Sequence, residues 1–235
     1  MIILIPGAMR YTLMRIIEGE DVGVSVAILA GGQSRRMLRD KALVRLAPGE
    51  PTLIEMVAVV ASELSDDLMI IAPHERGYGA LLPGWRVLQD LEPGDGPAGG
   101  VITALRSARE NRVLVLPCDA PLLSLPLLRM LFERAADGHP VVPWREGSTR
   151  QGQGVTLEVL HAAYPVSALR ALEEGISTGE RRLYKLVERA GPVLVPPEVS
   201  MRYDPGLKSF QTLNSPDELA EVGSTLFGRA SAGLY

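Results

Sequence analysis

Short apolar runs of strand length alternate with segments of helical periodicity, and this alternation restricts the fold more than any other feature of the chain. Five or six apolar residues bounded by turn residues predict a buried strand, whereas apolar spacings of three and four predict a helix. The strand–helix–strand order favours βα units and a mainly parallel sheet. The expected strands are residues 24–29, 68–72, 86–88, 113–116 and 140–143, with weaker candidates at 155–160 and 193–195.

Two helix starts are readable in the residues themselves. Thr52 and Glu55 have the spacing of a capping box ahead of an apolar helical segment. Ser215 and Glu218 have the same spacing, with Pro216 at the first helical position. We therefore expect helices to begin close to residues 53 and 216.

The chain has 235 residues, a length that suits one large domain. We expect a single domain over residues 24–223, with a nucleotide-binding half at 24–143 and an acceptor-side half at 144–223. Residues 1–23 have no basic segment before their apolar start, so they are interpreted as a leader or extension that need not be ordered. Residues 224–235 form a tail. The polar, glycine-containing segment 145–154 predicts an exposed loop, placed to lie over a site.

Charge and cysteine content exclude several classes of protein. A net charge of −4 and an isoelectric point near 5.5 argue against a general nucleic-acid binder. No apolar run reaches the length of a membrane span, so no membrane partner is expected. The lone Cys118 cannot form an intramolecular disulfide and is compatible with a reducing cytoplasm. The composition suits an α/β protein that binds a small anionic ligand.

The first expected strand opens into a loop with glycines and cationic side chains, LAGGQSRRMLRDK, from Leu29 to Lys41. Backbone N–H groups at Gly31 and Gly32 can bind phosphate oxygens, and Arg36 and Lys41 can neutralise their charge. In an open parallel sheet, ligands bind beyond the carboxyl ends of the strands. This spacing therefore predicts a phosphate site at the end of the first strand.

Two further loops follow expected strands and carry unusual chemistry. Residues 90–100 begin with Asp90 and contain several glycines before a helical run, which suits either close approach to an anion or a tight turn alone. Asp119 follows the strand at 113–116, where a carboxylate can hold a divalent cation. For Asp119 an N-cap or an ordinary loop carboxylate is the alternative.

The three loops together resemble those of the molybdenum cofactor guanylyltransferases, members of a wider nucleotidyltransferase superfamily. The matching motifs are LAGGQSRRMLRDK, the loop from Asp90 to Gly100 and PCDAPLL, with fainter matches in GERRL and FQTLNSP. The resemblance extends from about residue 24 to residue 223. It implies a Rossmann-like, three-layer α/β/α fold with a mainly parallel mixed sheet, of the nucleotide-diphospho-sugar transferase type.

The resemblance also implies a reaction, in which GMP passes from GTP to the terminal phosphate of molybdopterin with release of pyrophosphate. It assigns catalytic roles to Lys41, Arg36 and Asp119. The nucleotide would be bound by Leu29, Ala30, Gly31, Gly32, Lys41, Asp90 and Asp119.

The remaining implied ligands are Mg²⁺, bound by Asp119, and an acceptor, either molybdopterin or Mo-molybdopterin. The acceptor would be bound by Asn214 and by Arg182, for which a solvated helix start is the alternative. Molybdoenzyme chaperones are the expected protein partners, and the reaction is expected in the cytoplasm.

Four positions depart from the motifs of that family. Leu38 and Thr212 replace a glycine and an asparagine, and Ala98-Gly99 replaces Leu-Ala. Ala72-Pro73 stands where an asparagine commonly helps to recognise the base. Cytidylyl transfer, transfer to another phosphorylated acceptor and a non-catalytic nucleotide-binding partner therefore stay open. No G-x-G-x-x-G opens the first helix, which disfavours a dinucleotide-binding enzyme, and no G-x-x-x-x-G-K-[ST] occurs in the chain, which disfavours a P-loop enzyme.

Overall fold

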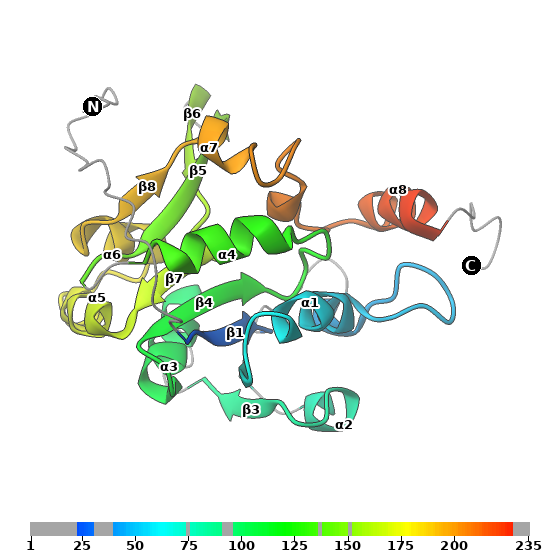
Figure 1. Ribbon diagram of the computed structural model, residues 1–235, viewed down its shortest axis with the longest axis horizontal. Coiled ribbons are helices and arrows are strands. Elements are labelled where there is room, and N and C mark those ends of the chain that lie inside the picture. The colour runs from blue at the N-terminus through cyan, green and yellow to red at the C-terminus, as the bar shows by residue number, and fades with distance from the viewer. Residues whose placement is uncertain are drawn as a thin grey trace.

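The computed structural model describes residues 23–30, 40–73, 76–90, 96–135, 138–149 and 152–227, and over these residues it shows one mixed sheet with helices on both faces (Figure 1). The strand order is β3-β2-β1-β4-β7-β5-β6, and β8 pairs with β5. The first four strands are mutually parallel, whereas β7 is antiparallel to both β4 and β5. The predicted three-layer fold with a mainly parallel mixed sheet is confirmed. The strands are β1 (Ser25–Leu29), β2 (Asp67–Ala72), β3 (Arg86–Gln89), β4 (Arg112–Pro117), β5 (Val141–Thr149), β6 (Gly152–Leu157), β7 (Ala162–Pro165) and β8 (Val193–Val195).

Local sequence signals account for the helix starts. The Thr52 hydroxyl accepts a hydrogen bond from Glu55 N, and the Glu55 carboxylate accepts one from Thr52 N, so the predicted capping box is present. Ser215 and Glu218 make the same reciprocal pair at the start of the last helix. The α-helices are α1 (Leu53–Ser62), α2 (Tyr78–Leu81), α3 (Pro97–Ser107), α4 (Leu125–Glu133), α5 (Leu169–Ser177), α6 (Leu183–Arg189), α7 (Pro197–Ser200) and α8 (Pro216–Phe227); three 3₁₀ turns are η1 (Lys41–Leu43), η2 (Val166–Ala168) and η3 (Lys208–Phe210).

The two faces of the sheet bury two separate apolar clusters. Successive side chains of β1 alternate between them, with Val26 and Ile28 on one face and Ala27 and Leu29 on the other. Helices α1 and α4 cover the first face, and α3, α5 and α6 cover the second. Burial on both faces explains why these strands are nearly continuous apolar runs.

A third, smaller apolar cluster packs α8 against the start of α1 and the segment before it. Leu219 and Val222 of α8 pack with Leu46 and Leu53. A Cβ atom at Gly223 would lie 2.8 Å from Leu46 O, so only glycine allows this close approach. Figure 1 shows α8 beside α1, at the opposite end of the molecule from α5 and α6. None of the helices in the described part of the chain is long and apolar enough to cross a membrane.

The prediction of an exposed loop at 145–154 is wrong, because most of this segment is a β-hairpin. Strand β5 continues to Thr149 and pairs with β6 from Gly152 onwards, in a register that runs from Trp144 opposite Leu157 to Thr149 opposite Gly152. Pairing across the hairpin satisfies the backbone of a polar sequence that has no strand-like apolar pattern. Strand β7 was not predicted for a similar reason, since its four residues are too short to show a period.

Candidate active site

The carboxyl ends of β1 and β4 lie side by side and place two of the predicted loops together. Cys118 N donates to Leu29 O at 3.3 Å, and Ala30 N donates to Ile71 O at 2.8 Å, so the pairing extends past the strand ends. Leu29 and Ala30 are buried here. The backbone that leaves β1 therefore starts beside the segment that carries Asp119.

Three of the predicted site residues meet at this edge of the sheet. The Lys41 ammonium lies 3.3 Å from Asp119 Oδ2 and donates a second hydrogen bond to Asn214 Oδ1. The side chains of Lys41 and Asp119 are 21% and 17% exposed, so both groups stay accessible to a ligand. A cation, a carboxylate and an amide from three distant parts of the sequence thus share one cluster.

Backbone contacts carry Asn214 to this position. Leu213 N donates to Asp119 O at 2.9 Å, which ties the segment before α8 to the end of β4. The Asn214 amide donates to Thr212 Oγ1 at 2.9 Å, and Asn214 N donates to the Glu218 carboxylate at 2.5 Å. This hydrogen bond from Asn214 N lowers the pKa of the Glu218 carboxyl. Thr212, one of the departures from the family motif, therefore orients the amide of Asn214.

Asp90 lies just after strand β3, which is separated from β1 by β2. Asp90 N donates to Ala72 O at 3.0 Å, and Asp90 Oδ1 accepts from the Thr103 hydroxyl at 3.4 Å. Helix α3 begins at Pro97, earlier than the helical run expected after Gly100. A Cβ atom at Gly100 would lie 3.3 Å from the Leu29 side chain, so this glycine allows α3 to pack closely on β1.

Asp40 also belongs to this site, although the sequence motifs predicted no role for it. Its carboxylate caps the turn η1 that begins with Lys41, since Ala42 N donates to Asp40 Oδ1 at 3.1 Å. Asp40 Oδ2 accepts from the Tyr78 hydroxyl at 2.6 Å and from Arg76 Nη1 at 3.0 Å. The adjacent Asp-Lys pair in the sequence could have indicated a role for Asp40, but nothing in the sequence indicated that Tyr78 and Arg76 bind it.

Not every predicted residue can be placed at this cluster. Gly31, Gly32 and Arg36, with the departure at Leu38, lie outside the described residues. Arg182 is the N-cap of α6, and its guanidinium binds the Glu180 carboxylate at 2.7 Å. The structure does not bring Arg182 to the cluster of Lys41, Asp119 and Asn214.

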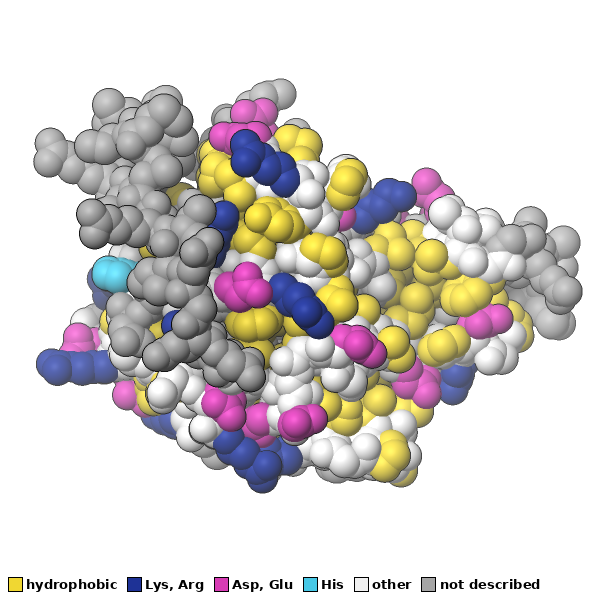
Figure 2. Space-filling model, viewed as in Figure 1, with side chains coloured by type: hydrophobic (Ala, Val, Ile, Leu, Met, Phe, Trp, Pro, Cys, Tyr) yellow, Lys and Arg dark blue, Asp and Glu magenta, His cyan; other side chains and the backbone are white. Residues whose placement is uncertain are grey.

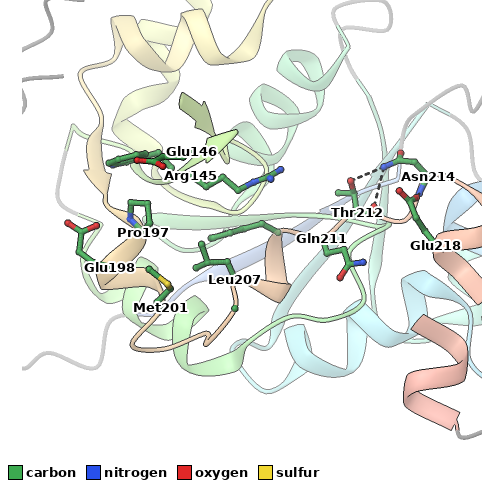
Figure 3. A pocket seen from close by; sticks show the side chains of 13 residues that line it. Arg145, Glu146, Pro197, Glu198, Met201, Leu207, Gln211, Thr212, Asn214 and Glu218 are labelled. Atoms are coloured by element: carbon green, nitrogen blue, oxygen red, sulfur yellow. Dashed lines mark hydrogen bonds between the residues drawn. The ribbon is translucent and has the colours of Figure 1, made fainter. Parts of the chain in front are cut away.

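A groove extends from this cluster toward β5 and α7, with a cavity volume of about 790 Å³. Figure 3 shows Thr212, Asn214 and Glu218 at one end and Arg145 and Glu146 at the other. The lining residues are Trp144, Arg145, Glu146, Pro197, Glu198, Met201, Gly206, Leu207, Phe210, Gln211, Thr212, Asn214 and Glu218.

The groove wall contains one strained backbone position. Leu207 has φ of +53°, a left-handed conformation that costs a branched residue free energy. The buried Asp204 carboxylate accepts from Ser209 N at 2.8 Å, and Asp204 O accepts from Leu207 N at 2.9 Å, so this turn is held from both sides. Backbone strain of this kind clusters at active sites, ligand clamps and switch regions.

On the face that Figure 2 draws, the charged side chains of the described residues are of mixed sign. Figure 2 shows Lys and Arg side chains scattered among acidic and apolar ones. Burial raises the pKa of the Cys118 thiol, and the neighbouring Asp119 raises it further. A protonated thiol is a poor nucleophile, so Cys118 does not supply the chemistry at this edge.

Comparison with known proteins identifies the family. Residues 26–193 match the family described as the MobA-like NTP transferase domain. The chain belongs to this family. Nucleotidyl transfer is therefore its activity, and a divalent metal is typical of such enzymes.

Relatives of this MobA-like protein cover nearly the same length. A probable molybdenum cofactor guanylyltransferase of Methanothermobacter thermautotrophicus is 33% identical over 202 residues, which are 83% of this chain and 96% of that protein. A molybdenum cofactor guanylyltransferase of Pseudomonas syringae pv. tomato is 35% identical, over 84% and 92% of the two chains. The crystal structure of molybdopterin-guanine dinucleotide biosynthesis protein A from Archaeoglobus fulgidus superposes with a TM-score of 0.71 at 27% identity, covering 87% of this chain and all of that one.

Proposed function

We propose that this protein transfers GMP from GTP to the terminal phosphate of molybdopterin and releases pyrophosphate. The observation that carries the proposal is the contact of Lys41 with both Asp119 and Asn214 at the carboxyl edge of the sheet, beside a groove of about 790 Å³. Relatives named as molybdenum cofactor guanylyltransferases support the choice of donor and acceptor.

The proposed reaction needs positioning and charge neutralisation rather than a general base. A phosphate monoester has a second pKa of about 6, so the attacking oxygen is already largely ionised near neutral pH. The Lys41 ammonium would exchange its contact with Asp119 for the α-phosphate of GTP and offset the charge that develops there. Arg36 would assist at the triphosphate. Leu29, Ala30, Gly31, Gly32 and Asp90 would bind the nucleotide at the ends of β1 and β3.

Mg²⁺ is the metal that we propose for Asp119. Within the described residues, no group of three or more His, Cys, Asp and Glu side chains could hold a metal by protein ligands alone. Mg²⁺ usually takes only one or two carboxylates and completes its coordination with water and substrate phosphates, so a single accessible carboxylate fits. When bound, the ion would neutralise charge on the phosphate oxygens.

The groove is the proposed site of the acceptor. Its Asn214 end adjoins Lys41, where the terminal phosphate of molybdopterin must arrive. Trp144, Leu207 and Phe210 line its length with apolar surface, which suits a flat heterocycle such as a pterin. Arg182 stays a prediction as an acceptor ligand, since it is not among the residues that line this groove and its guanidinium binds the Glu180 carboxylate.

We place the reaction in the cytoplasm, which suits a chain with a single, unpaired cysteine. Transfer of the finished cofactor to molybdoenzyme chaperones stays a prediction drawn from the resemblance to the family.

The test is pyrophosphate release from GTP, CTP, ATP and UTP, each with molybdopterin and Mg²⁺, with the product identified by mass spectrometry. We expect release with GTP, loss of release on chelation of the metal, and recovery on addition of Mg²⁺. Release with CTP alone would show a cytidylyltransferase instead. If none of the four nucleotides supports pyrophosphate release, the protein would instead be a nucleotide-binding partner without turnover.

A further inference from the structure

The Asp40 carboxylate connects the turn that carries Lys41 to a different part of the fold. One oxygen caps η1 through Ala42 N, and the other accepts from the Tyr78 hydroxyl and from Arg76. The Asp40 side chain is only 12% exposed. Both oxygens of Asp40 therefore accept hydrogen bonds from the protein itself.

Tyr78 is a rigid point of attachment. Its side chain is fully buried in the same apolar cluster as Ile28 and Ile70 of the neighbouring strands. Burial raises the pKa of the Tyr78 hydroxyl, and the Asp40 charge raises it further, so the hydroxyl stays protonated and can donate. A hydrogen bond of 2.6 Å to a carboxylate is short and charge-assisted. The core thus holds Asp40 through a group that has little freedom to move.

Lys41 is anchored at two places by this arrangement. Its backbone begins the turn that Asp40 caps, and its ammonium contacts Asp119 and Asn214. We propose that Tyr78, assisted by Arg76, is a positioning residue that acts through Asp40 to hold the Lys41 ammonium at Asp119. The catalytic consequence rests on the proposed function, whereas the positioning itself can be measured without turnover.

The lysine content of the chain permits a direct measurement. The sequence contains three lysines, Lys41, Lys185 and Lys208, so competitive acylation with mass spectrometry gives the reactivity of Lys41 against two internal references. In Tyr78→Phe we expect Lys41 to be labelled about fivefold faster relative to Lys208, because its ammonium leaves Asp119 more often.

Tyr164→Phe is the matched control. Tyr164 is also fully buried, and its hydroxyl donates at 2.6 Å to a main-chain carbonyl, Val159 O, away from Lys41. This variant loses a tyrosine hydrogen bond of the same length to a neutral acceptor, so it should lose stability while the labelling of Lys41 stays unchanged. An unchanged labelling ratio in Tyr78→Phe, or an equal rise in both variants, would overturn the proposal.

Asp40→Asn is a second variant that separates the cap from the attachment. Asparagine is as good an N-cap as aspartate, so η1 keeps its cap while the charged acceptor for Tyr78 and Arg76 is lost. We expect Lys41 labelling to rise as in Tyr78→Phe. Unchanged labelling would show that capping alone positions Lys41 and would overturn the role of Tyr78.

The kinetic test uses the transfer reaction itself. Tyr78→Phe should lower kcat about tenfold with little change in KM, and it should have no further effect when Lys41 is already alanine. Equal effects of Tyr78→Phe with and without Lys41 would mean a general structural role and contradict the proposal. If the wild-type protein transfers no nucleotide but the labelling changes as expected, the proposed function fails and the positioning role stands.

Discussion

The two ends of the sheet each carry an aspartate paired with a cation, yet the pairs differ in burial and in the number of hydrogen bonds. At the amino ends of β1 and β2, Asp67 is 6% exposed and accepts from Ser25 Oγ at 2.6 Å, Arg86 Nη2 at 2.7 Å and Arg109 N at 3.0 Å. At the carboxyl ends, Asp119 is 17% exposed, and within the described residues Lys41 alone contacts its carboxylate, at 3.3 Å.

This difference separates a structural ion pair from one that can react. Burial acting alone would raise the pKa of the Asp67 carboxyl, but the hydrogen bonds from Ser25, Arg109 N and Arg86 outweigh it, and the pKa is lowered. A buried carboxylate that already accepts three hydrogen bonds contributes to folding and is poorly accessible to a new ligand. Asp119, with a long contact to one lysine, can exchange that contact for a metal or a substrate.

Replacement of Asp119 by alanine should have the largest effect. We expect nucleotidyl transfer to fall by at least about 10³-fold, because the proposed metal ligand is removed. The measurement is turnover at saturating Mg²⁺. Asp66→Ala removes an exposed carboxylate at the opposite end of the sheet and should leave turnover unchanged. Near-wild-type turnover in Asp119→Ala would refute the metal assignment.

Replacement of Lys41 by alanine should reduce turnover by about 10²–10³-fold with little loss of stability, because a partly exposed ion pair with a single contact of 3.3 Å contributes little to folding. The control is Lys185→Ala, which removes a lysine paired with Glu188 on the surface of α6. Rates and thermal melting should be measured for both. If Lys41→Ala lowered the melting temperature and kept its turnover, the two ends of the sheet would not differ as described.

Asp67→Ala should show the opposite behaviour. Loss of this carboxylate leaves Arg86 without its partner, so we expect the free energy of unfolding to fall by about 3 kcal/mol. Turnover per folded molecule should stay unchanged. Urea denaturation measures the free energy of unfolding, and the transfer rate divided by the concentration of active sites measures the turnover. A loss of turnover without a loss of stability would place Asp67 in the catalytic machinery.

Acid pH should distinguish Asp67 from another buried group, His161. Burial lowers the pKa of His161 to about 3, below its unfolded value of about 6.5. The unfolded chain therefore binds the proton first, and the contribution of neutral His161 is fully present above pH ~6.5 and is lost as pH falls. The contribution of Asp67 is lost only below its unfolded pKa of about 4.

The expected slope from His161 is about 1.4 kcal/mol per pH unit between pH ~6 and ~4. In His161→Gln this slope should disappear, whereas a slope below pH ~4 remains. Urea denaturation at several pH values measures both. A wild-type free energy of unfolding that did not change between pH 6 and pH 4.5 would show that His161 is not held neutral.

The structure also shows which contacts had no local signal. Lys41 and Asn214 are separated by 173 residues, and Lys41 and Asp119 by 78. Their meeting depends on the pairing of β1 with β4 and on the hydrogen bond from Leu213 N to Asp119 O. Motif resemblance selected these residues, but it could not show that they touch or that Tyr78 holds Asp40.

By itself, the sequence determined the parallel part of the sheet, the two capped helix starts and the residues expected to carry the chemistry. The strands and helix starts follow from local causes, since strands buried on both faces must be apolar and caps act within one turn, whereas the chemical residues were selected by motif resemblance. The tertiary structure alone decided the β5–β6 hairpin, strand β7, the groove lined by Trp144 and Leu207, and the attachment of Asp40 to Tyr78. Each of these depends on partners that are distant in the chain, and a polar or very short segment carries no pattern that names its partner.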